Sequence, residues 1–187
     1  MAYQQITADY ARTAIKGLES PGSVDPATWV ASAYQASQIV TVPSSRATFD
    51  EMKSTGAVDL VRNARLRALL ISYYSYDWSQ SPTVKAQAPY RELVRSVLPY
   101  SIQKAIKDSC GDIFRTIGAV SVTRLPKTCH IDVPAATIER AAASLRATPG
   151  LLPDLTYQLS LTETNIDTIP AVQQRLAGVI AATSAHD

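Results

Sequence analysis

Apolar side chains recur every three or four positions along most of this chain, the spacing that places them on one face of an α-helix. The sequence has no series of short runs that alternate apolar and polar residues, which a β-sandwich or barrel requires. The pattern therefore predicts an all-α fold, a kinked antiparallel bundle of four to five longer helices. The expected helical ranges are 2–18, 26–42, 48–56, 57–78, 88–110, 134–148 and 151–185.

Prolines mark where these helices start and bend. Asp25 followed by Pro26 is typical of a helix start, because the carboxylate can cap a free N–H and proline has no N–H to leave unpaired. Pro99 lies inside an apolar pattern and predicts a kink or break near Val97. Pro170 predicts a kink in the last helix for the same reason.

One stretch does not follow the helical pattern. Residues 110–134 hold β-branched residues, glycines and prolines, and predict an irregular connection with a short extended piece, flanked by the two cysteines. A short C-terminal tail is expected at about residues 183–187. The chain of 187 residues fits a single α-helical domain spanning 1–187.

Capping signals surround the short helix at 48–56. Thr48 and Glu51 have the spacing of a capping box, in which a hydroxyl and a carboxylate each satisfy the other's backbone donor. Gly56 is expected to close this helix in the left-handed conformation, and Asn63 to cap the next. Arg67 is expected to pair with a carbonyl end of a helix or with a nearby carboxylate.

Aromatic residues gather in the stretch 66–82, and two interpretations stay open. On a helix, Tyr73 and Tyr76 share a face with the leucines before them, while Tyr74 and Trp78 form an adjacent line. The rings either fill the core or wall a ligand pocket between helices. The pocket hypothesis includes two residues after the following turn, and its members are Tyr73, Tyr74, Tyr76, Trp78, Tyr90 and Arg91.

Charge and composition exclude several partners. Lysine and arginine number 18 against 16 acidic residues, a net charge of +2, and the basic residues are scattered rather than clustered. This disfavours nucleic acid as a partner. No apolar run is long enough to span a bilayer, and the first residues lack the apolar core of a signal peptide. Motifs for nucleotide, metal and hydrolase sites are absent from the sequence, so no cofactor or metal is expected.

The two cysteines, Cys110 and Cys129, allow three arrangements. A disulfide would close the irregular stretch between them, and two buried free thiols are the second arrangement. Third, Cys129 with His130 could belong to a metal site or, together with Asp132, to a cysteine-dependent enzyme. No CxxC pair or HxxxH partner supports the metal site.

The segment 46–74 resembles a family of uncharacterised bacterial proteins. Its pattern is Thr-Phe-x-Glu-Met-x-Ser-x-Gly, a short apolar turn, Asn, Leu-Arg-x-x-Leu and Tyr-Tyr. In that family one N-terminal transmembrane helix carries an α-helical extracytoplasmic domain without an assigned function. The resemblance implies a periplasmic or other extracytoplasmic location and an anchor that this chain does not contain. If Met1 is the native start, a cytoplasmic location is expected instead.

These observations lead to three functional hypotheses. The first is a non-catalytic, sensor-like or scaffold domain of a membrane-anchored protein that binds a small ligand or a protein partner. The second is the cysteine-dependent enzyme or metal site at Cys129 and His130. The third is a purely structural domain that oligomerises, for example as a homodimer, through an exposed apolar helix face.

Overall fold

The computed structural model describes residues 2–40, 46–75, 88–117 and 120–184, and it confirms the all-α fold. Within these ranges the only β-structure is one short hairpin. The elements in chain order are α1 (Ala2–Glu19), α2 (Pro26–Ala36), α3 (Ala47–Ser54), the 3-10 helix η1 (Ala57–Leu60), α4 (Ala64–Tyr74), α6 (Ala88–Val97), α7 (Tyr100–Cys110), β1 (Ile113–Ile117), β2 (Val120–Arg124), α8 (Ala135–Arg146) and α9 (Leu151–Ser184).

Most helix ends follow the predicted signals. The carboxylate of Asp25 accepts a hydrogen bond from the backbone N–H of Thr28 and so caps α2. The side chain of Asn63 caps α4 in the same way. Pro99 breaks the predicted helix into α6 and α7. By contrast, α9 stays one helix through Pro170.

Two details of the predicted elements are wrong. The capping box does not form, because α3 begins at Ala47 with Arg46 in the capping position, which leaves Thr48 inside the first turn. The expected helix over 57–78 is divided into η1 and α4 by three residues that end with the cap Asn63.

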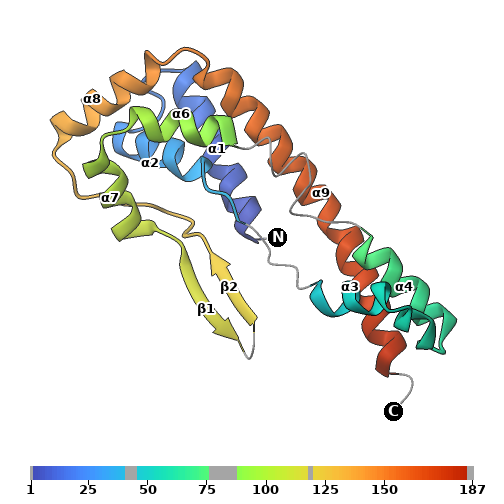
Figure 1. Ribbon diagram of the computed structural model, residues 1–187. Helices are drawn as coiled ribbons and strands as arrows, with labels where there is room; N and C mark the ends of the chain where they lie inside the picture. The colour runs from blue at the N-terminus through green and yellow to red at the C-terminus, as the bar shows by residue number, and fades with distance from the viewer. Residues whose placement is uncertain (1, 41–45, 76–87, 118–119, 185–187) are drawn as a thin grey trace.

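A β-hairpin over 113–124 occupies about half of the connection expected at 110–134, where a short extended piece was predicted. β1 and β2 pair antiparallel, with Phe114 opposite Thr123 and Arg115 opposite Val122. The β-branched residues of 113–124, which disfavour a helix, suit a pleated strand. The hairpin projects from the helices (Figure 1), and Phe114 is exposed.

The helical core lies at one end of the molecule. There α1, α2, α6, α7 and α8 pack against one another, and α1 and α6 also contact the first half of α9 (Figure 1). Trp29 is fully buried and donates its indole N–H to the carbonyl of Ala14 at 2.9 Å. We call this part the body. Its largest fully buried apolar side chains are Trp29, Tyr90, Ile102, Ile106, Leu145, Leu151 and Leu155.

The second half of α9 extends away from the body and carries α3, η1 and α4 (Figure 1). We call α3, η1, α4 and residues 169–184 of α9 the arm. No side chain of α4 is fully buried, although the predicted stripe of Leu66, Leu69, Leu70 and Tyr73 is partly covered. The arm therefore has little core of its own.

Candidate functional site

The structure separates the residues of the predicted aromatic pocket. Tyr73 and Tyr74 belong to the arm, where Tyr74 stacks on Phe49 with the ring centroids 4.5 Å apart. Tyr90 and Arg91 belong to α6 in the body (Figure 1). Because α9 holds the arm away from α6, these two pairs do not share a pocket. Tyr76 and Trp78 lie outside the described residues.

Tyr90 is a core residue. Its side chain is buried, and its hydroxyl donates to the carbonyl of Ala33 at 2.9 Å. Burial raises the pKa of the Tyr90 hydroxyl far above its usual value. This ring fills space between α6 and α2.

Arg91 is different, because it meets a second arginine at a common acceptor. Arg91 and Arg95 lie one turn apart on α6, and both donate to Oε1 of Gln38, at 3.3 Å and 3.1 Å. Arg91 also donates to the carbonyl of Ser37 at 2.8 Å, just after the end of α2. Two cations thus share one neutral amide oxygen.

Arg95 is held by Tyr34 of α2. Its guanidinium carbon lies 4.3 Å from the centroid of the Tyr34 ring, and the guanidinium donates to the Tyr34 hydroxyl at 2.9 Å. Stacking of this kind favours a cation on the face of the ring. The Nε–H group of Arg95 is buried and has no hydrogen-bond acceptor in the described part of the chain. This donor is unsatisfied at the centre of the cluster.

The surroundings of Arg91 disfavour its positive charge. Burial and the neighbouring charge of Arg95 lower the pKa of Arg91. Among the described residues neither guanidinium forms an ion pair with a carboxylate. Asp112 lies close enough to act on Arg91, but its Oδ1 accepts a hydrogen bond of 2.8 Å from the hydroxyl of Tyr3. The cluster therefore keeps excess positive charge.

A narrow hollow borders the arginine pair. It has a volume of about 20 Å³, which holds a single water molecule and no larger ligand. Its lining includes Tyr3 and Gln38, the residues that connect it to the arginines, and Gln4, whose Oε1 is buried without a partner in the described structure. The complete lining is Tyr3, Gln4, Thr7, Gln38, Val40, Thr162 and Asn165.

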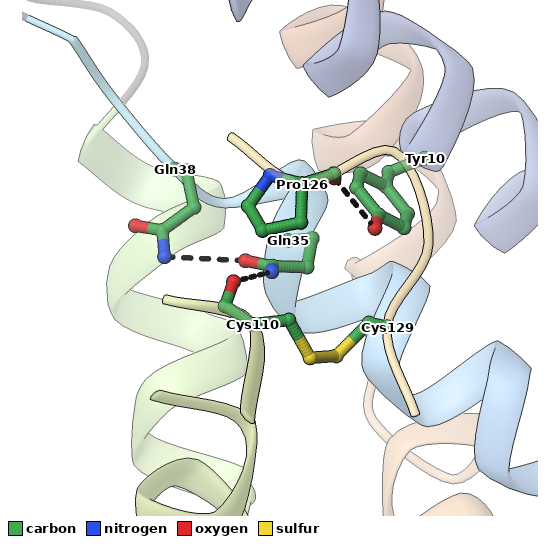
Figure 2. Close-up of a disulfide and its surroundings, with 6 residues drawn as sticks. All are labelled: Tyr10, Gln35, Gln38, Cys110, Pro126 and Cys129. Atoms are coloured by element: carbon green, nitrogen blue, oxygen red, sulfur yellow. Dashed lines mark hydrogen bonds between the residues drawn. A yellow bond between two sulfur atoms is a disulfide. The ribbon is translucent and has the colours of Figure 1, made fainter. Parts of the chain in front are cut away.

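A chain of hydrogen bonds joins the cluster to the cysteines (Figure 2). Gln38 donates to Oε1 of Gln35 at 3.2 Å, and Gln35 donates to the carbonyl of Cys110 at 2.6 Å. Cys110 forms a disulfide with Cys129, with the two Cα atoms 5.3 Å apart, so the predicted disulfide is confirmed. Beyond it, Tyr10 of α1 donates to the carbonyl of Pro126 at 2.9 Å. The disulfide thus fixes Cys110, the residue at which the hydrogen-bond chain from the arginine pair ends.

The disulfide also bears on the enzyme hypothesis. The sulfur of Cys129 is bonded to Cys110, so it cannot be the thiolate that a cysteine nucleophile requires. His130 is exposed. In the described ranges no three potential ligands gather at a metal site there or elsewhere. The hypothesis of an enzyme or metal site at Cys129, His130 and Asp132 is therefore not supported.

The residues of the 48–67 motif shape the arm. Gly56 has a φ of 73°, the left-handed conformation predicted for the end of α3. Arg67 donates to the carbonyls of Asp59 and Val61, at 3.3 Å and 3.5 Å, as predicted for a residue that pairs with a helix end. Thr48 and Glu51 are exposed. The described conformation of Gly56 and the contacts of Arg67 thus give these two residues structural roles.

The sequence pointed to Arg91 but missed Arg95, Tyr34 and Gln38. One signal was present: two arginines four positions apart on a helix repel each other unless something offsets their charge. Nothing in the sequence predicted that Gln38 would be their shared acceptor. That relationship depends on α2 ending at Ala36, earlier than its apolar pattern indicates.

Comparison with known proteins finds no family model, no curated protein and no solved structure that matches the chain. The resemblance of residues 46–74 to anchored bacterial domains stays a prediction. Within the described ranges, no helix is both long enough and apolar enough to cross a bilayer. A disulfide is compatible with an extracytoplasmic location.

Proposed function

We propose that this chain is a non-catalytic, sensor-like extracytoplasmic domain that binds a small anionic ligand at Arg91 and Arg95. The observation that carries the proposal is the convergence of both guanidiniums on the neutral Oε1 of Gln38. A carboxylate or phosphate oxygen is a better acceptor for them than an amide oxygen, because its negative charge adds direct attraction to both cations and it can accept paired hydrogen bonds from a guanidinium.

In this proposal the Gln38 side chain occupies the place of the ligand's oxygen. An arriving anion displaces the amide and accepts hydrogen bonds from both arginines, including the unsatisfied Nε–H of Arg95. Tyr34 holds Arg95 in position through its ring and hydroxyl. The anion also offsets the repulsion between the two cations, which adds a long-range contribution to affinity.

Displacement of Gln38 gives the domain a way to respond to its ligand. The amide of Gln38 begins the hydrogen-bond chain through Gln35 to Cys110, so its movement removes the first bond of that chain (Figure 2). The disulfide keeps the far end fixed. Binding is thereby linked to the end of α2 and to the segment from which the hairpin starts.

The location and the anchor are part of the same proposal. The disulfide supports an oxidising compartment, because cytosolic proteins rarely keep such bonds. The resemblance of 46–74 supports attachment to a membrane.

The test is calorimetric titration with inorganic phosphate, citrate and acetate at constant ionic strength. The expected result is saturable binding of at least one anion, weakened about tenfold or more by R91Q and by R95Q, since each removes charge-assisted bonds. R146Q is the matched control, because Arg146 also stacks on an aromatic ring, that of Trp29, but has no second arginine beside it. Equal binding by R95Q and the unmodified protein, or no saturable binding of any probe, would contradict the proposal.

A further inference from the structure

The part of the arm formed by α4 and by residues 169–184 of α9 is basic, whereas α3 and η1 carry the acidic residues Asp50, Glu51 and Asp59. From 61 to 75 and from 169 to 184 the sequence contains Arg62, Arg65, Arg67 and Arg175 and no acidic residue. Arg67 donates to backbone carbonyls. Among the described residues, none of the other three forms an ion pair with a carboxylate.

Apolar side chains lie exposed on the same part of the molecule. Leu60 is 78% exposed, Ile71 48%, Leu176 40% and Ile180 56%. In α4 every described side chain is at least partly accessible. A helical pair with so little buried surface gains stability when a partner covers its apolar residues.

The start of α4 is also hollowed. A broad, open depression of about 460 Å³ lies there, lined by Val61, Arg62, Asn63 and Leu66. Val61 and Leu66 give it an apolar floor, and Arg62 provides a positive charge. Such a depression fits an apolar side chain next to a carboxylate better than it fits the flat surface of a lipid bilayer.

We infer that the arm docks an acidic, amphipathic segment of a partner protein. Apolar side chains of that segment cover Leu60, Leu176 and the depression, while its carboxylates pair with Arg62, Arg65 and Arg175. Charge complementarity favours an acidic segment, because α4 and residues 169–184 of α9 carry arginines and no carboxylate. A second copy of the chain, which would offer Asp50, Glu51 and Asp59 to these arginines, is distinguished by the test. The inference concerns a surface distinct from the arginine pair of the body and does not depend on it.

The test uses the full chain and two synthetic amphipathic helical peptides, one with leucine and glutamate and the other with lysine in place of glutamate. Binding is followed by NMR. The expected result is that the acidic peptide binds and shifts resonances of residues 60–71 and 172–180. The double variant R62E/R65E should weaken this binding about tenfold or more. R140E, which reverses an exposed arginine of α8 in the body, is the control and should bind like the unmodified protein.

Several outcomes would overturn the inference. One is equal binding of the acidic and basic peptides, and another is peptide shifts confined to the body. Binding of the arm to phosphatidylglycerol vesicles without binding of the acidic peptide would assign the surface to a membrane. A concentration-dependent dimer that buries the arm would assign it to self-association. Because R91Q and R95Q leave the arm intact, they should not change peptide binding, so failure of the anion site is distinguishable.

Discussion

Arg95 and Tyr34 form one unit: the guanidinium carbon lies 4.3 Å from the ring centroid, and the same guanidinium donates to the ring's hydroxyl. These two contacts fix the direction of a side chain that ordinarily has much rotational freedom. They leave its Nε–H buried and unsatisfied. The Nε–H group of Arg95 is thus held in one direction, and the described chain supplies no acceptor for it.

The substitution Q38E places a carboxylate at the shared acceptor. Two hydrogen bonds from the arginines to a neutral oxygen then become ion-paired hydrogen bonds to a carboxylate, while the bond that Gln38 donates to Gln35 is lost. We expect the free energy of unfolding to rise by about 1 kcal/mol, because the two strengthened bonds outweigh the lost one. Chemical denaturation measures the change, and calorimetry should show that Q38E no longer binds phosphate. A Q38E protein less stable than Q38A would mean that the arginines do not favour an anion.

Loss of the disulfide should destabilise the protein by about 3 kcal/mol, the value that loop-closure entropy gives for a loop of this length. The bond joins residues separated by 19 positions. Denaturation of the C110S/C129S double variant checks the figure. Thiol counting on the unreduced protein, folded and denatured, checks the bond itself. Two reactive thiols after denaturation would contradict the structure at this point.

Position 17 must be glycine because the Trp29 ring packs directly against its Cα. A Cβ at position 17 would lie 2.1 Å from Cδ1 of Trp29, which is fully buried and cannot move aside. G17A should therefore cost about 2 to 3 kcal/mol of stability. G178A is the matched control, since its added methyl would lie 3.6 Å from Leu69 and alanine is the better helix former. We expect G178A to be neutral or stabilising by about 0.5 to 1 kcal/mol in thermal and chemical denaturation.

Stability should fall at alkaline pH because three buried tyrosines resist ionisation. Burial raises the pKa of Tyr10 from 10.0 to about 12, and burial raises the pKa values of Tyr3 and Tyr90 further. A folded-state pKa above the unfolded value means that the unfolded state loses its protons first. The stabilisation is therefore complete below pH 10 and is lost as the pH rises toward 12.

Phenolate absorbance, followed together with the free energy of unfolding, measures this loss. Y10F should reduce the slope of stability against pH above 10.0, whereas Y157F, which changes an exposed ring, should not. Ionisation of every tyrosine near its ordinary pKa in the folded protein would contradict the burial described here.

Local signals predicted much of the fold. Asp25, Asn63 and Gly56 act within a few residues of themselves, so their roles follow from the sequence. Pro99 separates α6 from α7, because proline lacks the N–H that a continuous helix would use, whereas Pro170 does not divide α9. The capping box failed because Thr48 and Glu51 have the right spacing but α3 begins two residues too early for them.

The site was less predictable because its contacts join distant parts of the chain. Gln38 and Arg95 are 57 positions apart, and Tyr3 and Asp112 are 109 positions apart. Periodicity indicates which face of a helix is apolar, but it does not indicate which helix covers that face. For the same reason, the sequence identified the apolar face of α4, but it did not predict that α4 lies on the arm.

The most direct measurement is NMR of isotope-labelled arginine side chains while inorganic phosphate is added at constant ionic strength. The account predicts a saturable shift of the Nε–H resonance of Arg95, absent in R91Q, while the resonance of Arg146 stays in place. If the Arg95 resonance does not move, or moves no more than that of Arg146, the arginine pair is not an anion site.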